Sequence, residues 1–169
     1  TKAIELDPKN AKAYNNRGNL FDQAGDKEKA LKDYNKAIEL DAKYVMAYNN
    51  RGILFAQTGD KEKALRDYKK AIELDPKEAK AYNNRGNLFQ QIGDKEKALR
   101  DYNKGIELDP KYAKAYANRG NLFQQIGDKE KALRDYNKGI ELDPKYAKAY
   151  ANRGNLFQQI GDKEKALRD

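Results

Sequence analysis

The chain contains no cysteine, no histidine and no serine. Without cysteine it forms neither disulfide bonds nor thiolate metal sites, so cysteine usage says nothing about the compartment in which it works. Without all three residue types, the usual nucleophile–base pairs of covalent catalysis are missing. Aspartate and glutamate recur at fixed spacing, and no segment departs from the pattern to form a unique site. The sequence therefore predicts a protein that is not an enzyme and holds no metal or cofactor.

Long hydrophobic runs are also missing from the chain. No apolar stretch approaches the roughly 20 residues needed to cross a bilayer, and no signal-peptide pattern follows Thr1. We therefore expect no membrane partner and a cytoplasmic location. The absence of an initiator methionine suggests an excerpt of a longer protein or a processed chain.

Hydrophobic residues make up only 38% of the chain and charged residues 37%. Such a polar composition is compatible with disorder or with a stacked array, in which each unit buries one stripe against its neighbours. Strict spacing excludes disorder, because all phenylalanines recur at intervals of 34 residues: Phe21, Phe55, Phe89, Phe123 and Phe157. A fixed period of this length is typical of one small supersecondary unit that is repeated.

The period divides the chain into a single array that covers residues 1–169. Residues 1–10 correspond to the second half of a helix that would end a repeat. Four full repeats and one truncated repeat follow, with the boundaries 11–44, 45–78, 79–112, 113–146 and 147–169.

Each repeat contains two segments with apolar residues at spacings of three and four, which predicts two amphipathic helices, here called helix A and helix B. In the third repeat, Gly93 suits the left-handed position after helix A, Asp94 suits the cap of helix B, and Pro110 ends helix B. Glu96 precedes Arg100 by four residues, a spacing that predicts an ion pair in every helix B. The residues predicted to be buried are Ala81, Tyr82, Gly86, Leu88, Phe89 and Ile92 in helix A, and Ala98, Leu99, Tyr102, Gly105, Ile106 and Leu108 in helix B.

These positions resemble those of the tetratricopeptide repeat family. That family has characteristic residues at positions 4, 8, 11, 20, 24, 27 and 32 of its repeat, which are matched here by Tyr82, Gly86, Phe89, Ala98, Tyr102, Gly105 and Pro110. The resemblance implies an all-α fold, an α-solenoid of stacked antiparallel helix pairs that forms a right-handed superhelix, with helix A on the concave face. The chain departs from the family at the seventh position, which is arginine instead of leucine. We expect each arginine to pair with an aspartate of the same repeat: Arg17–Asp33, Arg51–Asp67, Arg85–Asp101, Arg119–Asp135 and Arg153–Asp169.

The other face of helix A is rich in amide side chains, which include Gln124 and Gln125. An amide side chain offers donors and an acceptor that match the N–H and C=O of a peptide backbone. The pattern is similar to the asparagine ladder in the tetratricopeptide repeat domain of the O-linked N-acetylglucosamine transferases, and so implies a peptide or protein partner held in an extended form. The alternative is that the asparagines bond to adjacent helices or to water. The predicted binding residues are Asn16, Asn50, Asn84, Asn118 and Asn152 at the sixth position, Asn19, Asn87, Asn121 and Asn155 at the ninth, and Lys12, Lys80, Lys114 and Lys148 at the second.

The formal net charge of the chain is +8, but each repeat mixes the two signs. Residues 113–146 carry seven Lys or Arg and five Asp or Glu, interspersed along the helices, which is typical of a solvated exterior. We therefore expect no nucleic-acid partner. The second-position lysines favour acidic peptides, although the two-carboxylate clamp of the family is only half present.

An alternative function is a structural or model repeat scaffold without a dedicated ligand. Thr1 enters the repeat at its twenty-fifth position and Asp169 leaves it at its twenty-third, and neither end carries the polar capping element usual in arrays. The uncapped ends predict head-to-tail self-association of the chain.

Overall fold

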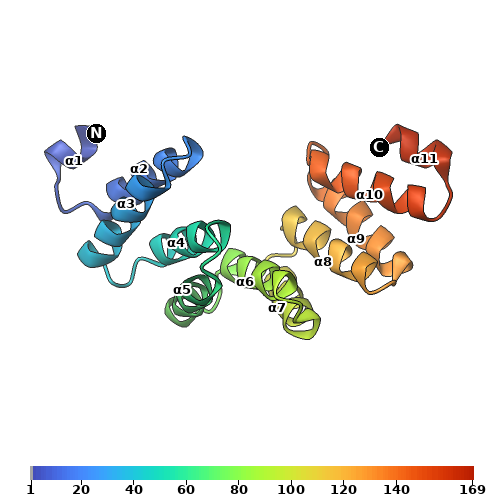
Figure 1. Ribbon diagram of the computed structural model, residues 1–169, viewed down its shortest axis with the longest axis horizontal. Coiled ribbons are helices and arrows are strands. Elements are labelled where there is room, and N and C mark those ends of the chain that lie inside the picture. The colour runs from blue at the N-terminus through green and yellow to red at the C-terminus, as the bar shows by residue number, and fades with distance from the viewer. Residues whose placement is uncertain (1) are drawn as a thin grey trace. The chain divides into compact units, whose positions relative to one another are not determined.

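The computed structural model describes residues 2–169, and all of the secondary structure in this range is helical (Figure 1). The short first helix corresponds to the end of a helix B, and helices A and B then alternate. The helices are α1 (Lys2–Leu6), α2 (Ala11–Gln23), α3 (Lys27–Leu40), α4 (Val45–Gln57), α5 (Lys61–Leu74), α6 (Ala79–Gln91), α7 (Lys95–Leu108), α8 (Ala113–Gln125), α9 (Lys129–Leu142), α10 (Ala147–Gln159) and α11 (Lys163–Arg168).

The turn between helices A and B has the chemistry that the sequence predicts. Gly93 has a φ of +85°, a left-handed conformation that suits glycine because it has no Cβ. Asp94 caps α7, since its side chain accepts a hydrogen bond from the backbone N–H of Lys97. Because the same pair of residues recurs in each repeat, every helix A is followed at once by an antiparallel helix B.

Helix B ends before an aspartate in every full repeat, even where proline is absent. Asp75 precedes Pro76 and adopts an extended conformation with φ −137° and ψ 94°. Asp41 precedes Ala42, yet its angles are nearly the same, φ −140° and ψ 96°. The Asp41 carboxylate accepts a hydrogen bond from the backbone N–H of Lys43 at 2.9 Å. The aspartate turn therefore ends the helix by itself.

The chain forms two compact units, residues 2–84 and 85–169, which divide within α6. In the first unit α2 packs against α3 and α4 against α5, and α3 also contacts α4 of the next repeat. In the second unit α8 packs against α9 and α10 against α11, while α9 also contacts α10. Each unit is thus built from antiparallel helix pairs stacked on the next pair, which confirms the predicted α-solenoid architecture.

The core of each unit is centred on the tyrosine of helix B. Tyr136 is fully buried, and it belongs to a cluster with Phe123, Ala132 and Leu156 of the next repeat. The predicted burial of Ile92 is wrong, since its side chain is 48% exposed. It follows the last residue of α6, where the chain turns away from the helix. The apolar spacing therefore continues one residue beyond the part of helix A that packs.

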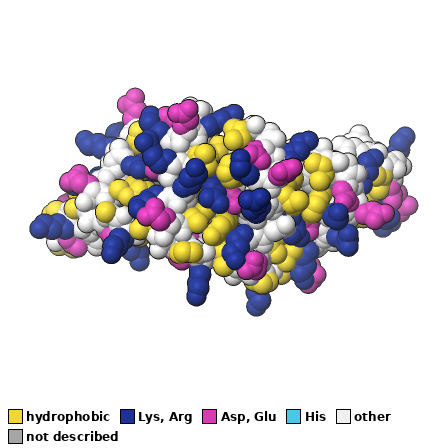
Figure 2. Space-filling view, turned by 90° about the horizontal axis from the view of Figure 1, so that it is seen from below, with side chains coloured by type: hydrophobic (Ala, Val, Ile, Leu, Met, Phe, Trp, Pro, Cys, Tyr) yellow, Lys and Arg dark blue, Asp and Glu magenta, His cyan; other side chains and the backbone are white. Residues whose placement is uncertain are grey.

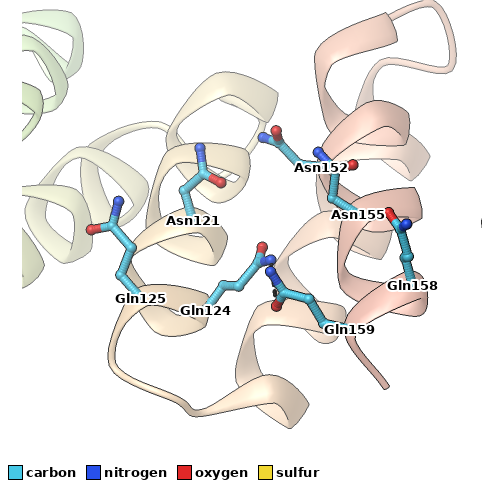
Figure 3. A pocket seen from close by; sticks show the side chains of 7 residues that line it. All are labelled: Asn121, Gln124, Gln125, Asn152, Asn155, Gln158 and Gln159. Atoms are coloured by element: carbon cyan, nitrogen blue, oxygen red, sulfur yellow. Dashed lines mark hydrogen bonds between the residues drawn. The ribbon is translucent and has the colours of Figure 1, made fainter. Parts of the chain in front are cut away.

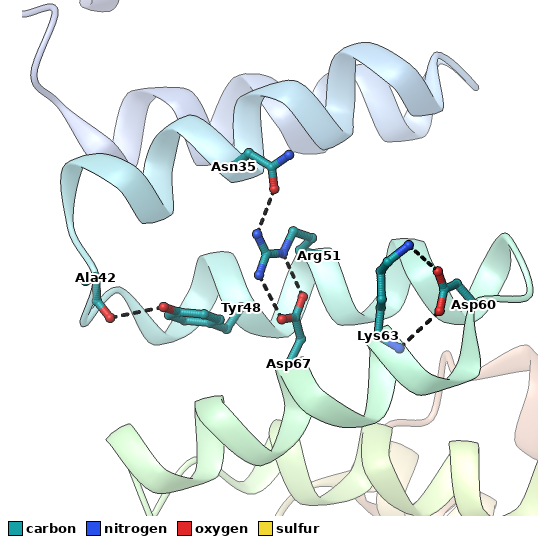
Figure 4. A network of polar contacts seen from close by, with 7 residues as sticks. All are labelled: Asn35, Ala42, Tyr48, Arg51, Asp60, Lys63 and Asp67. Carbon is teal, nitrogen blue, oxygen red and sulfur yellow. Dashed lines mark hydrogen bonds and ion pairs between the residues drawn. The ribbon is translucent and has the colours of Figure 1, made fainter.

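The predicted pairing of Arg with Asp within each repeat is confirmed, and it extends to the preceding repeat (Figure 4). Arg51 Nε and Nη2 donate to the two carboxylate oxygens of Asp67 at 2.7 and 2.8 Å. Its Nη1 donates to Asn35 of α3 at 2.7 Å, and its guanidinium lies over the rings of Tyr48 and Phe55. One arginine therefore joins three helices. The equivalent pairs are Arg17–Asp33, Arg85–Asp101, Arg119–Asp135 and Arg153–Asp169.

The ion pairs predicted along helix B are mostly wrong. Within residues 2–169 the spacing of four forms a pair only between Glu164 and Arg168. In every helix B that follows a helix A, the first-turn lysine reaches back to the capping aspartate, as Lys97 does to Asp94 at 2.6 Å. That carboxylate also accepts the backbone bond of the cap, and these bonds lower the pKa of Asp94.

Candidate functional site

Two sixth-position asparagines of the first unit, Asn50 and Asn84, are bonded within the protein. Asn50 Nδ2 donates to the side-chain oxygens of Asn15 and Asn19, both at 3.0 Å. Asn84 Nδ2 donates to Asn49 Oδ1 at 3.1 Å. Asn15 and Asn49 are buried, and they belong to the helix A one repeat earlier. For Asn50 and Asn84 the structure thus places the amide between adjacent helices, as in the alternative that the sequence left open.

Three of the ninth-position asparagines bind the core tyrosines. Asn121 Oδ1 accepts a hydrogen bond from the Tyr136 hydroxyl at 2.9 Å. Burial raises the pKa of Tyr136 and the nearby Asp135 raises it further, so the phenol stays protonated and continues to donate. Equivalent bonds join Tyr34 to Asn19 and Tyr102 to Asn87, both at 2.8 Å.

Five of the predicted binding residues lie exposed near the start of helix A. They are Asn16 and the second-position lysines Lys12, Lys80, Lys114 and Lys148.

A hollow lined only by amide side chains lies between α8 and α10, in the second unit (Figure 3). Its volume is about 410 Å³. Gln124 Nε2 donates to Gln159 Oε1 at 2.9 Å across it. Because the lining carries donors and acceptors but no charge, it suits a neutral polar ligand. The lining residues are Asn121, Gln124, Gln125, Asn152, Asn155, Gln158 and Gln159.

One donor in this hollow is left without an acceptor. Asn152 Nδ2 is buried and is the only buried side-chain nitrogen or oxygen in residues 2–169 that lacks a hydrogen-bond partner. Its counterparts donate to a fifth-position asparagine one repeat earlier, Asn15 for Asn50 and Asn49 for Asn84. For Asn152 the corresponding residue is Ala117, which has no side-chain acceptor.

Exposed isoleucines stand next in sequence to two of the lining residues. Ile126 directly follows Gln125, and Ile160 directly follows Gln159. Their side chains are 46% and 47% exposed, so roughly half of each apolar surface faces solvent.

The structure brings together three of the predicted binding residues in this hollow, Asn121, Asn152 and Asn155. The lysines predicted with them, Lys114 and Lys148, do not line it. Sequence reasoning missed Gln158 and Gln159 as site residues. They stand 34 residues after Gln124 and Gln125, so the repeat period itself was the signal that could have found them.

Basic and acidic side chains alternate on the surface, as Figure 2 shows for one face. Helix B contributes ion pairs along one side, such as Lys70–Glu73 at 2.7 Å and Lys138–Glu141 at 2.6 Å. Within residues 2–169 no group of His, Cys, Asp or Glu has the arrangement of a metal site, and none of the helices found there has the length and apolar character to cross a membrane.

Comparison with known proteins identifies the family. A family model described as tetratricopeptide repeat matches residues 11–44, 79–112 and 113–146. A second, described as TPR repeat, matches residues 54–93, and a third tetratricopeptide repeat model matches residues 33–66 and 135–168. No curated protein matches the chain significantly.

Solved structures resemble the chain over most of its length. MamA is 27% identical with a TM-score of 0.70, over 89% of this chain and 88% of MamA. YrrB, described as a TPR protein with an unusual peptide-binding site, is 27% identical with a TM-score of 0.67, over 99% of this chain and 87% of YrrB. The pilF structure from Pseudomonas aeruginosa shares the fold, with 21% identity and a TM-score of 0.84 over 94% of this chain and 72% of pilF. The chain belongs to the tetratricopeptide repeat family.

Proposed function

We propose that the chain is a non-enzymatic scaffold that holds an extended peptide segment of a partner protein against its A helices. The observation that carries this proposal is the hollow between α8 and α10, which is lined only by asparagine and glutamine. The similarity to YrrB, a protein described by its peptide-binding site, supports the same class of ligand.

The chemistry of the lining matches the main chain of a peptide. Each amide side chain offers N–H donors and a carbonyl acceptor, the same groups that an extended backbone presents. Binding through these groups reads few side chains of the ligand, so specificity must come from the border of the hollow. Ile126 and Ile160, which are half-exposed and directly follow two lining residues in sequence, are the proposed contacts for apolar side chains of the ligand.

The exposed lysines add a weaker, charge-dependent contribution. Lys114 and Lys148 stand at the second position of α8 and α10, outside the hollow. In this proposal they attract acidic residues that flank the bound segment, and salt weakens the attraction because exposed charges are screened. Among the other predicted asparagines, Asn155 lines the hollow and Asn118 belongs to α8 of the same unit, so both are further proposed contacts.

Removing exposed amides from the hollow is the direct test. Asn155→Ala together with Gln158→Ala removes two exposed side chains that have no hydrogen bond within residues 2–169. A peptide is first selected from a random 12-residue display library on the immobilised chain, and its affinity is measured by fluorescence anisotropy. We expect the double variant to bind it about tenfold more weakly, because two hydrogen bonds of about 0.5–1.5 kcal/mol each are lost.

The matched control is Gln23→Ala together with Gln91→Ala, which removes two exposed amides outside the hollow. This control is expected to bind the peptide as the unchanged chain does, and both double variants should keep the original melting temperature. Equal affinity of all three proteins, or failure to select any peptide, would contradict the proposal. Asn84→Ala is less suitable, because it removes the bond to Asn49 between two helices.

A second proposed function is structural, through head-to-tail association of this 169-residue chain. Leu20 is 61% exposed, whereas its equivalents Leu54 and Leu156 are 1% exposed because a neighbouring repeat covers them. At the other end Leu167 is 88% exposed. The two surfaces are those that meet inside the array, so they are complementary, and a contact of this kind propagates instead of closing.

Sedimentation equilibrium over a wide range of concentration tests this association. We expect the average mass to rise with concentration for the unchanged chain and to stay at the monomer value for Leu20→Glu, which places a charge in the contact. A monomer mass that does not change at millimolar concentration would contradict the proposal.

A further inference from the structure

We infer that Asn152 is the anchoring donor of the amide hollow, that it binds a main-chain carbonyl of the peptide, and that Ala117 leaves it available to do so. This inference rests on the proposed peptide-binding function and names the residue that first holds the peptide. The helices α6 and α8 differ in sequence only at the fifth position, which is Asn83 in α6 and Ala117 in α8.

The first unit demonstrates what a fifth-position asparagine does. Asn15 accepts a hydrogen bond from Asn50, and Asn49 accepts one from Asn84. Each of these acceptors is buried between two A helices. At these interfaces the sixth-position amide is therefore engaged before a ligand arrives, and a ligand carbonyl would have to displace an existing bond.

The interface between α8 and α10 lacks that acceptor. Ala117 stands at the fifth position. Asn121 Oδ1 accepts a hydrogen bond from Tyr136 but none from Asn152, whereas Asn19 accepts from both Tyr34 and Asn50. Asn152 Nδ2 is consequently buried without a partner, an unfavourable state for a polar group. Turning this amide into the hollow breaks no hydrogen bond of its Nδ2, whereas turning Asn50 breaks two.

The geometry selects the class of ligand. Asn152 extends from α10 toward α8, and six other amides surround the same hollow (Figure 3). Its Nδ2 is a donor only, so the ligand atom that meets it is an acceptor. No cation lines the hollow to favour a carboxylate. A neutral peptide carbonyl, flanked by further peptide groups for the glutamines, satisfies these conditions.

Restoring the missing acceptor is the test that the repeats themselves suggest. Asn15 and Asn49 occupy the fifth position in a fully packed interface, so asparagine fits this site in the same backbone. Gly139 faces Ala117, because a Cβ built on Gly139 would lie 3.8 Å from Ala117 Cβ. The first two repeats have alanine at the position of Gly139, so the glycine leaves more room beside residue 117. We therefore expect Ala117→Asn to fold and to engage Asn152 internally.

The experiment follows the side-chain NH₂ signals of Asn152 by ¹⁵N NMR during titration with N-methylacetamide, a probe that contains one peptide group. In the unchanged chain these signals are expected to shift and to saturate at millimolar probe. In Ala117→Asn they are expected to start at a hydrogen-bonded position and to stay there. The double variant Gln23→Ala, Gln91→Ala is the control, because both side chains lie outside the hollow and Asn152 should then respond as in the unchanged protein.

The display-selected 12-residue peptide gives an independent readout. Ala117→Asn and Asn152→Ala are each expected to weaken its binding about threefold to tenfold, the effect of one hydrogen bond. The Gln23→Ala, Gln91→Ala control should leave it unchanged. Asn152→Ala removes no bond of the Nδ2 atom, so its melting temperature should stay close to that of the unchanged chain.

The outcomes separate this inference from the proposed function. Saturable shifts of Asn152 with N-methylacetamide, without any selectable peptide, would support the anchor while the peptide function fails. Peptide binding that neither Ala117→Asn nor Asn152→Ala weakens would overturn the anchor while the peptide function stands. Equal shifts of Asn152 in the unchanged chain and in Ala117→Asn would also overturn it.

Discussion

Replacing Asp135 by alanine is expected to lower the free energy of unfolding by about 3 kcal/mol, because it leaves a largely buried arginine without its carboxylate. The Arg119 side chain is 19% exposed and the Asp135 side chain 8% exposed. Arg119 donates to both oxygens of Asp135 at 2.7 and 2.8 Å, and to Asn103 of the preceding helix B at 2.7 Å. The loss therefore weakens the helix pair itself and also its contact with the preceding repeat.

Two controls separate the buried pair from charge effects in general. Glu141→Ala breaks the exposed pair with Lys138 in the same helix and is expected to cost less than about 1 kcal/mol. Arg119→Leu together with Asp135→Leu should recover most of the loss, since apolar residues often replace a buried ion pair without penalty. Guanidinium denaturation, analysed with a nearest-neighbour model for repeats, measures all three. A loss below about 1 kcal/mol for Asp135→Ala would show that the pair is not needed.

Much of the architecture could be predicted because the decisive signals are local. Gly93 and Asp94 determine the turn through their own conformation and hydrogen bonds, and these residues recur in every repeat. The pairing of Arg51 with Asp67 was also within reach, because a repeated charge pair on facing helices has few other partners. Ile92 was misplaced because apolar spacing does not mark where a helix stops packing.

The candidate site was harder to predict, since its chemistry depends on residues one repeat apart. The sequence left open whether Asn50 faces a ligand or a neighbouring helix. That choice is made by Asn15, which lies 35 residues earlier and becomes adjacent only when the A helices stack. By the same reasoning, the donor of Asn152 is unpaired because residue 117 is alanine. The sixth-position asparagines themselves look identical in sequence.

Replacing Gly120 by alanine is expected to destabilise the chain by about 2–3 kcal/mol through overpacking. A Cβ at this position would lie 2.8 and 2.9 Å from the Tyr136 ring and 3.3 Å from the Ala132 carbonyl oxygen. Tyr136 is fully buried and its hydroxyl is held by Asn121, so the ring cannot move aside without disturbing its packing and that hydrogen bond. The clash therefore outweighs the helix-forming gain of about 1 kcal/mol that alanine has over glycine.

Gly139→Ala is the matched comparison, a glycine in the interior of the other helix of the same repeat. The nearest atom to its added Cβ is the Ala113 carbonyl oxygen at 3.2 Å, and the equivalent positions hold the buried Ala37 and Ala71 in the first two repeats. Since the same backbone accommodates alanine there, we expect this change to be neutral or to stabilise by up to about 1 kcal/mol. Thermal and guanidinium unfolding measure both variants. The two substitutions change stability in opposite directions because Gly120 faces a buried aromatic ring, whereas Gly139 faces a helix contact that can adjust. Equal effects of the two substitutions would contradict this account.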